Sequence, residues 1–126
     1  MPDRSRILLV DDDADSNAST REYLEFEGFD VVSAFSGEEA IRAVHVQCPQ
    51  VVVLDLELPD VRGDELARTL RKTPGMARIP ILVLSGRFVG DAARRAEVFA
   101  ANLQKPVEPQ LLCAEIRRHL HQKPSS

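Results

Sequence analysis

The sequence predicts one doubly wound α/β domain, with a five-stranded parallel sheet in the order 2-1-3-4-5 and five helices around it. Three short apolar runs lack a polar face, as is typical of central parallel strands with helices on both sides: residues 7–10, 51–54 and 81–84. Stretches with helical spacing lie between these runs, which indicates βαβ units. The chain has 126 residues, enough for one such domain and little more.

The first helix is predicted over residues 14–27, because Gly28 follows it and glycine is favoured just past a helix end. Val31 and Val32 then predict a weaker second strand. A short fifth strand is expected much later, at residues 102–104, on the edge of the sheet.

Ser36 is predicted to cap the second helix, and Glu39 three residues later completes a capping box. The third helix is expected over residues 64–72, where a Thr-Pro-Gly sequence then breaks the pattern. A fourth helix should start near Asp91, and a fifth should run over residues 109–121.

Composition limits the classes of function. Hydrophobic residues make up 44% and charged residues 29%, and 16 basic against 20 acidic side chains give a net charge of −4. This balance gives no electrostatic reason to expect direct nucleic-acid binding or an anionic membrane as partner. Cys48 and Cys113 are too few for a disulfide framework and are interpreted as reduced, apolar residues.

The ends of the chain suggest a location and a domain boundary. A charged start and a short apolar run predict neither a signal peptide nor a membrane span, so a cytoplasmic protein is expected. We expect the domain to cover residues 1–122, followed by a disordered tail at residues 123–126.

Polar side chains follow four of the predicted strands. Asp11 and Asp12 come after the first, Asp55 after the third, Ser85 after the fourth and Lys105 after the fifth. In a doubly wound sheet these positions meet at the carboxyl edge, where ligands bind. Crowded carboxylates repel one another unless a cation neutralises them, and oxygen ligands suit Mg²⁺. With a lysine beside them, they predict a phosphoryl-transfer site with a carboxylate nucleophile.

Four sequence segments, each at the end of a predicted strand, carry a resemblance to a known family. They are the apolar run into Asp11-Asp12 and residues 55–63, 82–86 and 104–106. Along nearly its whole length, the chain resembles bacterial response-regulator receiver domains of the chemotaxis-regulator-like single-domain kind. The resemblance implies a flavodoxin-like fold and a role in two-component phosphorelay signalling.

The same resemblance implies residue roles. Asp55 would accept a phosphoryl group as an aspartyl phosphate, Lys105 would pair with a phosphoryl oxygen, and Ser85 would hydrogen-bond the bound group and move its loop. The implied Mg²⁺ ligands are Asp11, Asp12, Asp55 and the main-chain carbonyl of Glu57.

The implied phosphodonor is a histidine kinase or a histidine phosphotransfer protein. Output would pass through contact with a downstream protein effector or a fused output domain, with no direct nucleic-acid or membrane partner. The chain would be a phosphoacceptor regulator rather than an enzyme, although it would assist its own phosphorylation and dephosphorylation.

Two alternatives stay open. The first is an interaction domain that keeps the fold without needing phosphorylation. The second is an enzyme of the doubly wound class, such as a flavin-binding protein or an aspartyl-phosphate phosphatase. The acidic loop at residues 11–13 disfavours a cofactor phosphate without metal, and no second aspartate stands two residues past Asp55 to act as acid and base.

One position departs from the family's pattern. Asn102 stands three residues before Lys105, where family members commonly carry an aromatic residue that reports phosphorylation. Phe88 or Phe99 could substitute, although lone aromatic residues usually belong to the core.

Three further expectations concern side chains outside this set. Glu57 and Arg87 are expected to overhang the site and to pair, which would tune the lifetime of the phosphorylated state. Small polar residues at positions 16–19 could admit a helix of a kinase or form plain surface. The cations at positions 117–123 suit the C-terminal end of the last helix.

Overall fold

The computed structural model describes residues 5–86 and 99–120. Within them, five parallel strands form one sheet in the order β2-β1-β3-β4-β5, which confirms the predicted topology. The strands are β1 (Arg6–Val10), β2 (Asp30–Ala34), β3 (Val51–Asp55), β4 (Ile81–Ser85) and β5 (Ala101–Gln104). The helices are α1 (Ala14–Phe26), α2 (Gly37–Val46), α3 (Gly63–Arg71) and α5 (Pro109–Leu120). The helix predicted near Asp91, together with Arg87, Phe88 and the tail, lies outside the described residues.

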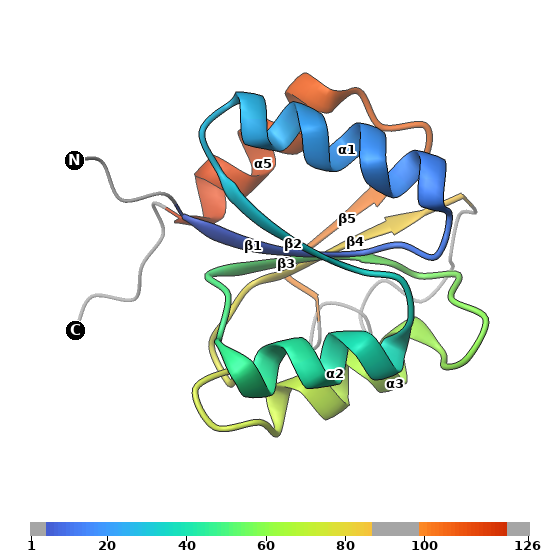
Figure 1. The fold of residues 1–126 in the computed structure, drawn as a ribbon, viewed down its shortest axis with the longest axis vertical. Coiled ribbons are helices and arrows are strands. Elements are labelled where there is room, and N and C mark those ends of the chain that lie inside the picture. Colours follow the sequence, from blue (N-terminus) through green and yellow to red (C-terminus); the bar gives the residue numbers. More distant parts are fainter. Residues whose placement is uncertain (1–4, 87–98, 121–126) are drawn as a thin grey trace.

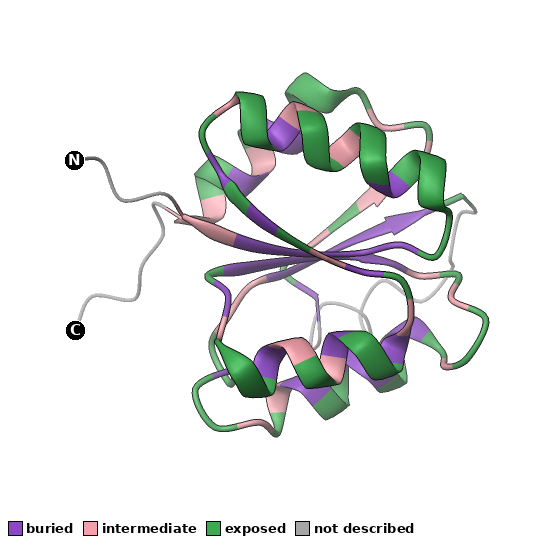
Figure 2. Ribbon diagram, in the orientation of Figure 1, coloured by how far each residue is buried: buried purple, intermediate pink, exposed green. Residues whose placement is uncertain are grey.

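The helices cover both faces of the sheet. Helices α1 and α5 lie on one face, and α2 and α3 lie on the other (Figure 1). Strands β3 and β4 are buried along their whole length, which explains why their sequences show no polar alternation. Figure 2 shows the same pattern, with buried strands between helices whose outer faces are exposed. None of the helices in the described part of the chain is long and apolar enough to cross a membrane.

Two hydrophobic cores result, one on each face of the sheet. Val52 and Leu54 contribute to the core under α2 and α3, whereas Val51 and Val53 contribute to the core under α1 and α5. Cys113 is buried in the second core, where burial raises the pKa of its thiol. Its surroundings fit the expected reduced, apolar residue.

The predicted helix ends are confirmed with one change. Gly28, directly after the C-cap of α1, has a φ of 102°, the left-handed conformation that favours glycine. The Ser36 side chain caps α2 by accepting a hydrogen bond from the Glu39 amide at 3.2 Å. The Glu39 carboxylate, however, accepts from the Phe35 amide at 2.8 Å rather than from the Ser36 amide, so the capping box reaches one residue further back.

The segment between β3 and α3 packs against the start of α2. Asp60 accepts hydrogen bonds from the Gly37 and Glu38 amides, at 3.1 and 3.3 Å. A Cβ atom at Gly37 would overlap the Val61 side chain, so only glycine lets the segment approach this closely. This contact fixes the chain that leaves β3, just beyond Asp55.

Candidate functional site

The carboxyl ends of four strands bring the predicted site residues to one edge of the sheet. Asp55 is the last residue of β3 and pairs in register with Leu84, and Ser85 is the last residue of β4. The side chains of Asp11, Asp55 and Ser85 are buried at this edge. The strand register therefore places together residues that are up to 94 positions apart, from Asp11 to Lys105.

Asp55 and Lys105 form the closest ion pair of the site. The Lys105 ammonium donates to Asp55 Oδ2 at 2.8 Å, and the Glu57 amide donates to Asp55 Oδ1 at 3.0 Å. The Lys105 amide also donates to the Ser85 carbonyl at 2.7 Å, which ties the end of β5 to the end of β4. The Lys105–Pro106 peptide bond is cis.

Three carboxylates crowd this edge. Asp11, Asp12 and Asp55 each offer an oxygen, and these oxygens all lie within 4.8 Å of one another. At that separation two unit charges repel by about 3.5 kcal/mol at an effective dielectric constant of 20. Lys105 offsets only part of the repulsion. An oxygen-only set of this kind fits a hard divalent cation such as Mg²⁺.

The burial of the site also shifts pKa values. Burial is the main cause that raises the pKa of the Asp11 carboxyl above its ordinary value, while the hydrogen bond from the Asp13 amide acts in the opposite direction. Burial by itself would lower the pKa of the Lys105 ammonium. The hydrogen bond to Asp55 and the negative charges around Lys105 outweigh that effect, so this pKa is raised.

Helix α1 contains a buried polar residue whose burial the sequence did not predict. Residues 16–19 were expected to lie together on the surface, and Ser16, Ala18 and Ser19 are exposed. Asn17 is buried instead, with only 1% of its surface exposed. Asp13 caps α1 by accepting from the Asp15 amide at 3.1 Å. Asparagine is common both on surfaces and at helix ends, so only its partners from β2, distant in sequence, reveal its position.

Two other expectations have different outcomes. Glu57 is exposed beside the site, and its carboxylate lies close to Gly86, because a Cβ atom on that glycine would be 3.5 Å from Glu57 Oε2. Its predicted partner, Arg87, is outside the described residues.

Asn102 is exposed on β5, and Phe99 belongs to the buried core under α2 and α3, as expected of a lone aromatic residue.

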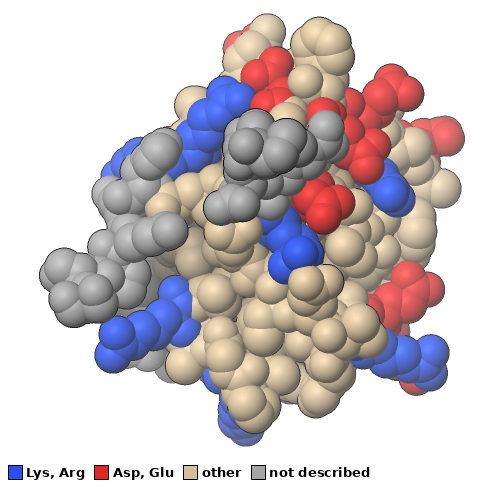
Figure 3. Space-filling view, turned by 60° about the vertical axis from the view of Figure 1, so that its left-hand side comes forward, with Lys and Arg blue, Asp and Glu red and all other residues tan. Residues whose placement is uncertain are grey.

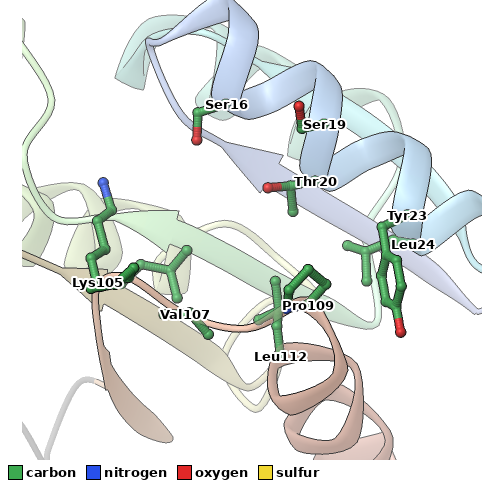
Figure 4. A pocket seen from close by; sticks show the side chains of 11 residues that line it. Ser16, Ser19, Thr20, Tyr23, Leu24, Lys105, Val107, Pro109 and Leu112 are labelled. Atoms are coloured by element: carbon green, nitrogen blue, oxygen red, sulfur yellow. The ribbon is translucent and has the colours of Figure 1, made fainter.

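A groove of about 560 Å³ opens next to Lys105, between α1 and the segment that leads from β5 into α5. Figure 4 shows the Ser16 and Thr20 side chains of α1 on one side, with Lys105 and Val107 on the other. Pro109 and Leu112 of α5 line the apolar end of the groove; the remaining lining residues are Ser19, Tyr23, Leu24, Leu84 and Pro106.

Known proteins share this sequence pattern and fold. A family model described as the response regulator receiver domain matches residues 7–117. The chain is 36% identical to the DNA-binding response regulator MtrA of Mycolicibacterium paratuberculosis and 33% identical to the phosphate regulon transcriptional regulatory protein PhoB of Rhizobium meliloti. These matches cover 93% and 91% of this chain but 52% of each relative, so the chain spans about half their length.

Among solved structures, a CheY-like response regulator receiver domain protein from Methanospirillum hungatei is 30% identical, with a TM-score of 0.86 over 95% of this chain and 96% of that one. Proteins of this kind are signalling regulators rather than classical enzymes. The chain belongs to the response-regulator receiver domains, the phosphorylation-activated signalling modules of two-component systems.

Proposed function

We propose that this receiver domain accepts a phosphoryl group on Asp55, in a Mg²⁺-dependent reaction, from a histidine kinase or a histidine phosphotransfer protein. The observation that carries the proposal is the pairing of Asp55 with Lys105 at 2.8 Å inside a cluster of three carboxylates. A buried carboxylate beside a fixed ammonium and two further acidic side chains suits a phosphoryl acceptor better than a structural ion pair.

In this proposal the carboxylates of Asp12 and Asp55 and the main-chain carbonyl of Glu57 would hold Mg²⁺, and Asp11 would contribute mainly through water. When bound, the ion would supply positive charge that offsets the negative charge of the transition state. The carboxylate oxygens within 4.8 Å of one another support the acidic part of this ligand set.

The remaining site residues have roles that follow from their positions. Lys105 now pairs with Asp55, and it would turn to a phosphoryl oxygen once Asp55 forms an acyl phosphate, because the negative charge then lies on the phosphoryl oxygens. Ser85, at the end of β4, would donate its hydroxyl hydrogen to the same group and draw the loop after β4 inward. Asn102 replaces the usual aromatic reporter, so the response to phosphorylation would not depend on an aromatic residue at this position.

The groove beside Lys105 is the proposed approach for the phosphodonor. It places the exposed small side chains of Ser16 and Ser19 beside the site, where a helix carrying a phosphohistidine could lie close to Asp55. The apolar end of the groove, at Pro109 and Leu112, would bury side chains of that helix.

Output is proposed to pass through contact with a protein effector or a fused output domain. The mycobacterial relative is named as DNA-binding, and this chain matches only about half of it. For the segment described, we propose no direct contact with nucleic acid. On the face that Figure 3 draws, acidic side chains gather at the upper right, and Lys and Arg are spread over separate positions. We also propose a cytoplasmic location and a domain that covers residues 1–122.

The test is labelling with a small phosphodonor such as acetyl phosphate, with the phosphorylated species separated on a phosphate-affinity gel. The wild-type protein should be labelled in Mg²⁺ and not in EDTA. Asp55→Asn should abolish labelling, whereas Asp15→Asn, in the same acidic region but outside the cluster, should leave it intact. A folded wild-type protein that accepts no phosphoryl group under these conditions would instead favour a phosphorylation-independent interaction domain.

A further inference from the structure

Asn17 is a buried polar side chain whose hydrogen-bonding groups are all used. Its Nδ2 donates to the Asp11 carbonyl at 2.9 Å and to the Ala34 carbonyl at 3.3 Å. Its Oδ1 accepts from the Ser33 hydroxyl at 2.6 Å. The two carbonyls fix which end of the amide faces them, because only Nδ2 can donate to them, and the Ser33 hydroxyl holds the other end by donating to Oδ1. Buried amides with complete partners hold one conformation firmly.

These bonds join the loop that carries Asp11 and Asp12 to the end of β2. The Asp11 amide donates to the Ala34 carbonyl at 3.0 Å, so both backbone polar groups of Asp11 are tied. Its side chain is tied as well, because the Asp13 amide donates to Asp11 Oδ1 at 3.0 Å. Within the described residues, Asn17 is therefore the side chain that holds the Asp11 backbone carbonyl.

The position of this tie matters because the neighbouring charges repel. Asp11, Asp12 and Asp55 have oxygens within 4.8 Å of one another, and an untethered loop would relax by moving its carboxylates apart. A cation would then have to bring them back together before all of them could contact it. If the loop is already held in place, the protein binds the cation without the free-energy cost of that rearrangement.

We propose that Asn17 is a positioning residue that holds Asp11 in the metal-binding arrangement, and that Ser33 orients the Asn17 amide for this task. The inference rests on the proposed function, because it assigns the residues that prepare the same site. Asn17 touches neither the ion nor the phosphoryl group; it acts through the Asp11 backbone. Partners of this kind around metal ligands commonly change metal affinity by about 10- to 100-fold when they are removed.

The experiment compares Mg²⁺ affinity, measured by isothermal titration calorimetry, in four proteins. They are the wild type, Asn17→Ala, Ser33→Ala and the control Ile116→Val. Ile116 is fully buried in the core under α1 and α5, so this control loses packing without touching the acidic loop. Amide signals of residues 11–13 in metal-free ¹H–¹⁵N spectra give a second readout that does not depend on activity.

Asn17→Ala should bind Mg²⁺ roughly 10-fold more weakly, and Ser33→Ala should show a smaller loss in the same direction. Ile116→Val should lose thermal stability and keep the wild-type affinity. In the metal-free spectra, the signals of residues 11–13 should shift or broaden in the first two variants only. If Asn17→Ala does not fold, Ser33→Ala decides the question, because it keeps the Asn17 side chain.

Three results would overturn the inference, and they are distinguishable. If the wild type binds Mg²⁺ and both variants bind it equally well, Asn17 has only a structural role and the proposed function stands. If the wild type takes up no Mg²⁺ at all, the proposed function fails and the inference fails with it. An equal loss of affinity in Ile116→Val would also overturn it, because general destabilisation would then explain the effect.

Discussion

Replacing Asp12 by asparagine should stabilise the metal-free protein. Asp12 is exposed, and its carboxylate lies within 4.8 Å of carboxylate oxygens of both Asp11 and Asp55. The substitution keeps the shape of the side chain and removes the charge. The Lys105 ammonium already pairs with Asp55 at 2.8 Å, so the loss of the Asp12 charge leaves that ion pair in place.

The expected gain follows from Coulomb's law. Two unit charges at 4.8 Å, the limiting separation in the cluster, repel by about 0.9 kcal/mol in bulk water and about 3.5 kcal/mol at an effective dielectric constant of 20. Because Asp12 is exposed, the value in water is the nearer guide, and two such pairs are relieved. We therefore expect Asp12→Asn to raise the free energy of unfolding by about 1–2 kcal/mol in the absence of metal.

Urea unfolding in EDTA, followed by circular dichroism, measures this difference. Asp15→Asn is the matched control, because Asp15 lies in the first turn of α1 and its loss should be slightly destabilising. The advantage of Asp12→Asn should shrink in 1 M salt, where screening is strong, and also in Mg²⁺, which stabilises only the protein that binds it. An Asp12→Asn protein that is less stable than wild type in EDTA would refute the reasoning.

Three further substitutions test contacts away from the acidic cluster, each by urea unfolding. Gly37→Ala should cost about 1–3 kcal/mol, because the new methyl group would overlap Val61, and adding Val61→Ala should restore most of the loss. Asp60→Ala should cost about 1 kcal/mol at neutral pH through the lost helix cap. Hydrogen bonds from two α2 amides lower the pKa of Asp60 in the folded protein. The contribution of Asp60 to stability is therefore complete above the pKa of the unfolded chain, near 4, and is lost as pH falls through the lower pKa of the folded protein. The free energies of unfolding of the wild type and Asp60→Ala should therefore converge at acidic pH. Arg117→Ala should cost about 1–2 kcal/mol, because the Arg117 guanidinium donates to the Glu27 carbonyl at the end of α1 and lies 5.4 Å from the centroid of the Phe29 ring. Arg118→Ala is the control and should cost little, because within the described residues Arg118 pairs only with Glu115 on its own helix. Equal losses in the two variants would contradict the contacts assigned to Arg117.

The sequence predicts the sheet well because parallel strands covered on both faces carry a simple signal. The runs in β3 and β4 are apolar throughout, and the structure buries every residue of both strands. Strand β2 was underestimated, since it lies at the edge of the sheet and exposes Asp30 and Val32. An edge strand with two exposed positions among five gives a pattern that resembles a loop.

The edge of the sheet where the site lies was equally predictable, because strand ends fix it. Asp55 and Ser85 follow apolar runs directly, and the register of neighbouring strands places such residues side by side. The supporting contacts were not predictable. Asp60 bonds α2 amides 22 and 23 residues away, and Arg117 bonds Glu27 across 90 residues. Local sequence carries no record of such partners, and their residue types are common on surfaces.

The site and the core make opposite contributions to stability, and the same strands carry both. Burying Asp55 beside two like charges is unfavourable, and its strand β3 is otherwise wholly apolar and buried. A side chain such as Val53 contributes about 1.5–3 kcal/mol when fully buried, so a few such residues offset the electrostatic repulsion at the strand's end. The repulsion is then available to be relieved by a bound cation. A receiver domain needs that property, because its two states can differ only by as much as the site's interactions differ between them.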